Sequence, residues 1–124
     1  MIAYITLGTN DPDRAGKFYD ALFEEIGAGR VMESERLTAW ATGPGQAMFA
    51  IIKPFDENPA TVGNGTMISI GAENPAAVDR LYAKAIELGG TDEGAPGVRA
   101  EMFYIGYFRD LEGNKLNFFC KNDA

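Results

Sequence analysis

The sequence predicts an α+β protein made of two tandem βαβββ modules. One observation is an internal repeat: shifted by 63 positions (67 − 4), residues 4–12 align with residues 67–75 without a gap. Another is the order of the apolar patterns, since each half reads as a strand, a helix and then three strands. A period of half the chain indicates two similar modules and not a long solenoid. The length of 124 residues suits a single domain of ordinary size.

The repeat keeps its register from the first strand through the following helix. Residue types recur at matched positions: Ile5 and Ile68, Gly8 and Gly71, Pro12 and Pro75, Tyr19 and Tyr82, Gly27 and Gly90. Chance supplies a few such matches, but not a register held without gaps over this length. The repeat therefore predicts that the second module copies the architecture of the first.

The first module begins with a strand and a helix. Residues Ile2–Leu7 form a short apolar run that is typical of a strand. Asn10 or Asp11 can cap the helix that follows, with Pro12 near its first position, where a missing N–H costs nothing. Apolar residues then recur at spacings of three and four and predict one buried helix face: Ala15, Phe18, Tyr19, Leu22 and Ile26. Gly27 ends this helix.

The second helix is expected to start near Pro75, to bury Val78, Leu81, Tyr82 and Ala85, and to stop at Gly89–Gly90. Three strands are expected after each helix, at residues 30–35, 36–42 and 48–53 in the first module and near 91–98, 102–109 and 115–121 in the second. A turn at residues 110–114 makes the last two strands a hairpin.

Residues 54–64 are the longest stretch without a periodic pattern, and they contain Pro59, Gly63 and Asn64. We interpret this stretch as the linker between modules of about residues 1–55 and 65–124. The alternative is that a loop of this length closes over a ligand site.

Composition excludes several common classes of function. The chain has no histidine, which removes Ser-His-Asp and Cys-His machinery as well as imidazole metal ligands. With 18 acidic and 11 basic residues the formal net charge is −7, and no run of Lys or Arg is present. We therefore expect neither nucleic acid nor a membrane surface as a partner. The acidic balance favours cationic ligands or simply serves solubility.

The sequence also predicts a cytoplasmic protein. The single Cys120 cannot form an internal disulfide, which fits a reducing compartment. The first apolar run is too short for a signal peptide or a membrane span.

Three segments carry a resemblance to a known superfamily: Tyr4–Asp11, Phe18–Leu22 and Phe108–Asn117. Two tandem modules with an Asp-Pro helix start and a closing Asp-x-x-Gly-Asn hairpin resemble the vicinal oxygen chelate superfamily. Its members include glyoxalase I, the bleomycin resistance proteins and the extradiol dioxygenases. The likeness covers the whole chain as a single glyoxalase-like domain, residues 1–124. It implies two tandem βαβββ modules forming an incomplete barrel, whose concave face holds the site, usually in a homodimer.

Strand alternation separates two faces in each expected sheet. One face is apolar, as the amphipathic helices require for packing. The other is mixed, and the resemblance implies that it lines a cavity for a small molecule. The expected ligand-binding residues are Tyr4, Thr6, Trp40, Met67, Ser69, Lys115, Asn117 and Phe119. The alternative is that this face is solvated or filled by side chains.

In metal-dependent relatives, the resemblance implies His ligands at the positions of Tyr4 and Met67 and a Glu ligand at the position of Asn117. Phenol, thioether and neutral amide groups do not make a stable divalent site, because such metals prefer imidazole, thiolate or carboxylate. We therefore expect no bound metal and no cofactor.

Three functional interpretations remain. The first is a metal-free small-molecule binding protein like the bleomycin resistance proteins, with aromatic lining from Tyr4, Trp40, Tyr104, Tyr107 and Phe119. The second is a lactoylglutathione-lyase-like lyase or isomerase with a replaced metal site. Its acid–base candidates are Tyr4, Glu101 and Tyr104, and its anion anchors are Arg36, Lys53 or Lys115. The third is a ferredoxin-like βαββ barrel, in which a half-length repeat would be unexpected. Extradiol dioxygenase activity is not expected.

Overall fold

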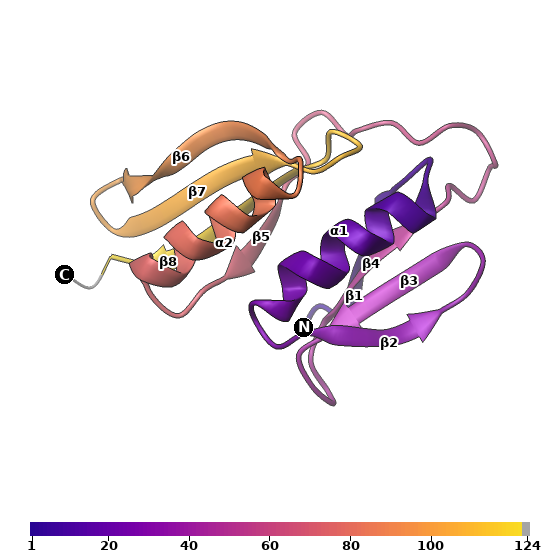
Figure 1. Ribbon diagram of the computed structural model, residues 1–124, viewed down its shortest axis with the longest axis horizontal. Coiled ribbons are helices and arrows are strands. Elements are labelled where there is room, and N and C mark those ends of the chain that lie inside the picture. Colours follow the sequence, from indigo (N-terminus) through magenta and orange to yellow (C-terminus); the bar gives the residue numbers. More distant parts are fainter. Residues whose placement is uncertain (123–124) are drawn as a thin grey trace. The chain divides into compact units, whose positions relative to one another are not determined.

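The computed structural model describes residues 1–122 and contains two compact units, the first ending at Val62 and the second beginning at Gly63. Each unit is a βαβββ module with one helix on a four-stranded sheet (Figure 1). Module 1 consists of β1 (Tyr4–Gly8), α1 (Pro12–Glu24), β2 (Gly29–Glu33), β3 (Leu37–Ala41) and β4 (Met48–Ile52). Module 2 consists of β5 (Ile68–Gly71), α2 (Pro75–Glu87), β6 (Thr91–Arg99), β7 (Phe103–Arg109) and β8 (Lys115–Lys121). The predicted α+β class and the two βαβββ modules are confirmed.

The two sheets have the same topology. The strand order is β1-β4-β3-β2 in module 1 and β5-β8-β7-β6 in module 2. In each module the first and last strands pair in parallel, while the other pairs are antiparallel. A parallel pair needs a crossover connection, which the helix and two strands between them supply. Neither sheet closes on itself, as an incomplete barrel requires.

Both helices begin with the same capping arrangement. The Asp11 carboxylate accepts a hydrogen bond from the Arg14 N–H at 3.1 Å, and Asn74 Oδ1 accepts one from the Ala77 N–H at 2.8 Å. A proline follows each cap at the start of the helix. Asp11 is therefore the cap of α1, and the repeat extends to the hydrogen bonds that start each helix.

The core of each module lies between its helix and one face of its sheet. In module 1 the core is aromatic: the Tyr19 ring centroid lies 4.8 Å from that of Phe49 and 5.7 Å from that of Trp40. In module 2 the Phe108 and Phe118 rings stack with centroids 5.1 Å apart. Burying such side chains stabilises the fold by roughly 1.5–3 kcal/mol each. The amphipathic pattern of the two helices predicts this packing.

The expected linker spans the boundary between the units, and its first part folds back on module 1. The Ala60 N–H donates to Asn10 Oδ1 at 2.6 Å, and Asn10 Nδ2 donates to the Ala60 carbonyl at 3.3 Å. A Cβ at Gly8 would lie only 3.0 Å from the Ala60 Cβ, so the absence of a side chain at Gly8 permits this close approach. Asn10 therefore holds the segment after β4 against the end of β1.

Within residues 1–122, neither helix has the length and apolar character that a membrane span requires.

Candidate functional site

In each module one face of the sheet is covered by the helix, and we call the opposite one the open face. Trp40 and Phe49 contact the rings of α1, so their neighbours along the strands, Ala39 and Ala50, point to the open face of module 1. The central row of this face runs across the strands through Thr6, Ala50, Ala39 and Met32. The matching row of module 2 runs through Ser69, Asn117, Tyr107 and Gly94.

All of the predicted ligand-binding residues except Trp40 lie on an open face. Tyr4 and Thr6 belong to module 1, and Tyr4 is 58% exposed. The remaining five share the open face of module 2, where Met67 directly precedes β5: Met67, Ser69, Lys115, Asn117 and Phe119. The alternation of residue types along the strands is sufficient to predict this grouping.

Asn117 is a buried polar residue of this face. Its side chain is only 2% exposed, and its Nδ2 donates to Met67 Sδ at 3.7 Å. A thioether sulfur is a weak acceptor. Within the described residues the Asn117 Oδ1 atom is buried and accepts no hydrogen bond. A buried acceptor without a donor costs about 1–3 kcal/mol. Asn117 therefore brings a polar oxygen into a buried position where no described group donates to it.

Two cationic side chains lie against Tyr107, the neighbour of Asn117 in the central row. The Lys115 Nζ atom is 5.4 Å from the Tyr107 ring centroid, and the Arg99 Cζ atom is 5.8 Å from it. Both distances are within the range of a cation–π contact. Neither cation forms an ion pair within residues 1–122. The open face of module 2 therefore carries positive charge beside a hydrogen-bonding amide.

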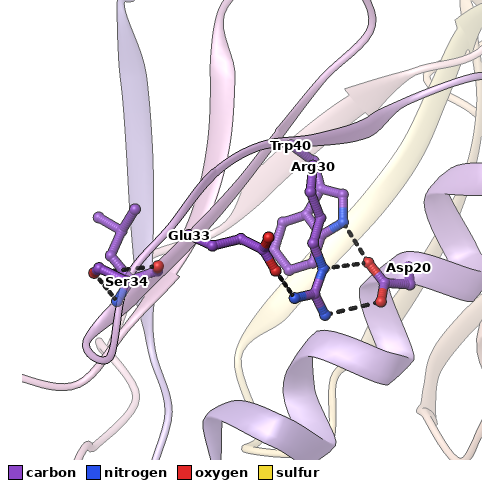
Figure 2. Close-up of polar contacts among 6 residues, drawn as sticks. Asp20, Arg30, Glu33, Ser34 and Trp40 are labelled. Atoms are coloured by element: carbon purple, nitrogen blue, oxygen red, sulfur yellow. Dashed lines mark hydrogen bonds and ion pairs between the residues drawn. The ribbon is translucent and has the colours of Figure 1, made fainter.

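The structure corrects the expected position of Trp40. Its side chain is 1% exposed and lies on the face covered by α1, where its Nε1–H donates to Asp20 Oδ1 at 2.9 Å (Figure 2). Arg30 donates to both oxygens of Asp20, each at 2.8 Å, and also to Glu33. The strand Leu37–Ala41 has apolar residues on both faces, so its alternation does not say which face the helix covers.

These contacts also shift the pKa values of Asp20 and Arg30. The hydrogen bonds from Arg30, opposed in part by burial and aided by the indole, lower the pKa of Asp20. The hydrogen bonds to Asp20 and Glu33 raise the pKa of Arg30. The network ties α1 to β2 and β3, so Trp40 belongs to the core of module 1.

Two of the three acid–base candidates lie away from the open faces. Tyr104 pairs with Cys120 on the helix side of its sheet, and its hydroxyl donates to Asp79 Oδ1 at 2.6 Å. This hydrogen bond, followed by burial, raises the pKa of Tyr104. Glu101 lies in the turn between β6 and β7, with a φ of 59°. Of the three, only Tyr4 is on an open face.

Arg36 and Lys53, two of the candidate anion anchors, line a separate pocket of about 550 Å³ within module 1. The segment after β4 forms part of its wall through Pro54, Glu57, Asn58 and Pro59. Arg36 Nη2 donates to the Lys53 carbonyl at 3.0 Å, and the guanidinium carbon lies 5.4 Å from the Phe55 ring centroid. Only Lys115 among the three anchors is on an open face.

The groups at the expected metal-ligand positions do not fit a divalent cation. In module 2, Met67 and Asn117 contact each other through a thioether and an amide N–H, and neither group carries negative charge. Tyr4 offers a neutral phenol group, which is not among the imidazole, thiolate and carboxylate ligands that such metals prefer. Among residues 1–122 no three Asp, Glu, Cys or His side chains are clustered so that they could hold a metal ion.

Sequence reasoning missed Arg99 as a residue of the open face. Its strand is irregular, because the pairing of β6 with β7 shifts register between Asp92 and Gly94 and again between Gly94 and Gly97. Simple alternation therefore fails along β6. The hairpin turn at residues 110–114 does fix the register of β7 against β8, and reading that register would have placed Ile105 and Arg109 beside the predicted residues.

Two βαβββ modules, each with one open sheet face, define a two-module protein of the glyoxalase type. The chain is 34% identical to a glyoxalase/bleomycin resistance protein from Albidiferax ferrireducens T118, with a TM-score of 0.88 over 96% of this chain and 97% of that one. A hypothetical protein from S. aureus is 26% identical, with a TM-score of 0.75 over 96% and 91% of the two chains. A lactoylglutathione lyase from Agrobacterium tumefaciens, at 22% identity and a TM-score of 0.70 over 96% and 92%, shares the fold.

No protein-family model matches the chain, and no curated protein gives a significant match. The likeness to the Albidiferax protein covers nearly all of both chains. The chain therefore belongs to the glyoxalase/bleomycin resistance protein family. The resemblance to the vicinal oxygen chelate superfamily that the sequence motifs predict is thereby confirmed.

Proposed function

We propose that this protein binds a small organic molecule on its open sheet face without a metal and releases it chemically unchanged. The observation that carries the proposal is the buried Asn117 amide, whose Oδ1 has no donor within the described residues. An acceptor of this kind is costly in the free protein and gains a hydrogen bond when a ligand donor arrives. Asn117 also stands where the metal-dependent relatives are expected to have a carboxylate ligand.

Metal-free binding is favoured over lyase or isomerase chemistry by the positions of the acid–base candidates. Tyr104 donates its proton to Asp79 on the helix side, and its raised pKa makes it a poorer acid or base near neutral pH. Glu101 lies in a turn outside the open face. Tyr4 is the one candidate on an open face, and no described carboxylate or cation contacts its hydroxyl to activate it.

A thermal-shift and calorimetric screen tests this proposal. The probes are S-lactoylglutathione, aromatic carboxylates and bleomycin, each with and without EDTA. We expect at least one probe to bind equally well in EDTA and to be recovered intact by mass spectrometry. Turnover of the probe, or binding that requires an added divalent metal, would contradict the proposal.

The substitution Asn117→Leu is the matched variant, because leucine has the same branching without polar atoms. We expect it to weaken binding and to leave the fold at least as stable, since it removes an unsatisfied buried acceptor. Loss of binding in this variant therefore cannot be attributed to unfolding. Unchanged affinity in Asn117→Leu would remove Asn117 from the site.

A further inference from the structure

We propose that the ligand of the module 2 open face is a small organic anion with a flat apolar body and a hydrogen-bond donor. This inference rests on the proposed function and specifies its ligand. It differs from the cationic ligand that is one of the two interpretations of the net charge of −7, the other being solubility.

The charge of this face is opposite to that of the whole protein. Its cationic side chains come from three strands and alternate onto the open side: Arg99, Arg109, Lys115 and Lys121. Among the strand residues of this face that the structure describes, the one carboxylate is that of Glu93, which is paired with Arg109. Charges farther away than about 8 Å are largely screened at physiological ionic strength, so the local cations decide what binds here.

We assign Lys115 and Arg99 as the cations that bind the anionic group. Each of them approaches the ring of Tyr107, which lies in the central row of this face. Arg99 is held in place because its Nη2 donates to the Ala95 carbonyl at 2.9 Å. Gly94 lies opposite Tyr107, and a Cβ there would come within 3.3 Å of the Tyr107 ring. Cationic donors bind carboxylates and phosphates through short, charge-assisted hydrogen bonds.

The remainder of the face fits a flat apolar body. The Phe103 and Phe119 rings lie with centroids 4.9 Å apart on the same side of the sheet as Tyr107. Asn117, next to Tyr107 in the central row, supplies an acceptor for a ligand O–H or N–H. An aromatic carboxylate that carries a hydroxyl group combines these three features.

The open face of module 1 cannot supply the same recognition. None of its strand residues on that face is charged, and its central row contains Thr6, Ala50, Ala39 and Met32. The anion is therefore assigned to module 2 alone.

The test uses three probes of nearly equal shape and different charge. They are 4-hydroxybenzoate, neutral 4-hydroxybenzamide and cationic 4-hydroxybenzylamine, titrated by calorimetry and by NMR of the labelled full-length protein. We expect the carboxylate to bind at least about tenfold more tightly than the amide, and more weakly as the salt concentration rises. The amine is expected to bind least well.

The variants Lys115→Gln and Arg99→Gln should each lower the affinity for 4-hydroxybenzoate by about tenfold, since each removes one charge-assisted contact. The control is Lys84→Gln, which removes one positive charge from α2 on the helix side of the same module and should change the affinity by less than about twofold. Comparable losses in Lys84→Gln would show a general charge effect and overturn the assignment.

The outcomes separate this inference from the proposed function. If the amide or the amine binds the open face as tightly as the carboxylate, the inference is wrong and the proposed function stands. If the carboxylate binds best but perturbs residues outside the open face of module 2, the inference is also wrong. If none of the three probes perturbs that face, the inference is wrong, whereas the proposed function is decided separately by the wider screen of S-lactoylglutathione, aromatic carboxylates and bleomycin.

Discussion

The open faces of the two modules differ in polarity and charge. In module 1 the central row holds Thr6, Ala50, Ala39 and Met32, whereas the matching row of module 2 holds Ser69, Asn117, Tyr107 and Gly94. The helix sides, in contrast, share the same kind of side-chain cap followed by proline, and the strand order of the two sheets is the same. The repeated architecture thus depends on the helix side, and the open side is free to differ in polarity and charge.

Ala50 of module 1 and Asn117 of module 2 occupy matched positions, and the difference between them affects the stability of the fold. Both residues are almost fully buried and occupy the same place in their sheets, but only Asn117 brings polar atoms with it. Its unsatisfied acceptor costs the fold about 1–3 kcal/mol, which a purely structural role does not require. This difference supports our proposal that the ligand binds to module 2.

The largest expected effects test whether the helix sides are equivalent. Trp40→Ala and Phe108→Ala should each destabilise the protein by about 3–5 kcal/mol, because each removes a fully buried ring. Urea unfolding followed by circular dichroism measures this loss. Tyr4→Ala on the open face is the control and should change the free energy of unfolding by less than about 0.5 kcal/mol. A small loss in only one of the two core variants would break the equivalence.

The next largest effects are expected at the two matched buried positions of the open faces, Ala50 and Asn117, when the amide is removed from one and introduced at the other. Asn117→Leu should raise the free energy of unfolding by about 1 kcal/mol, and Ala50→Asn should lower it by about 2 kcal/mol, since the first removes an unsatisfied amide and the second introduces one. Chemical denaturation of both variants provides the comparison. Destabilisation by Asn117→Leu would mean that the amide contributes to folding, against our account.

A smaller effect is expected in acid and concerns module 1. The pKa of Asp20 is lowered in the fold, so its contribution is present above the unfolded value of about 3.8 and is lost as the pH falls through the lower folded value. The Tm of Asp20→Asn should therefore fall less steeply between pH 6 and pH 2 than the Tm of the parent protein. Glu24→Gln, elsewhere on the same helix, is the control. An equally steep fall of Tm in Asp20→Asn and in the parent protein would argue against a stabilising Arg30–Asp20–Trp40 network.

The smallest effect is expected in alkali and concerns module 2. The hydrogen bond to Asp92 raises the pKa of Tyr82 to about 12. A raised folded pKa means that this contribution is complete below the unfolded value of about 10 and is lost as the pH rises through about 12. Tyr82→Phe should therefore lose less stability than the parent protein between pH 9 and pH 12. Equal alkaline losses in the two proteins would contradict this interpretation.

The fold could be predicted well from the sequence because its signals are local and repeated. The Asp11–Pro12 and Asn74–Pro75 starts, the helical spacings and the hairpin turn each specify structure within a few residues. The end of the first helix differs from the prediction. Helix α1 ends at Glu24, before the expected Ile26, and the backbone then turns at Gly27, which has a φ of 73°.

The site was only partly predictable, because its remaining features depend on contacts between distant segments. Trp40 could not be assigned to a face until α1 was placed over it, since β3 is apolar on both sides. Arg99 could not be assigned because two register shifts interrupt the alternation of its strand. The orphaned acceptor of Asn117 depends on which groups surround it, which no pattern along β8 reveals.

The most direct test of the central claim is an NMR map of 4-hydroxybenzoate binding on the labelled protein. Our account predicts that the largest amide shifts occur along the central row of module 2, at Ser69, Asn117 and Tyr107. It also predicts that they disappear in Asn117→Leu. Largest shifts along Thr6, Ala50 and Ala39 of module 1, or on either helix, would contradict the account.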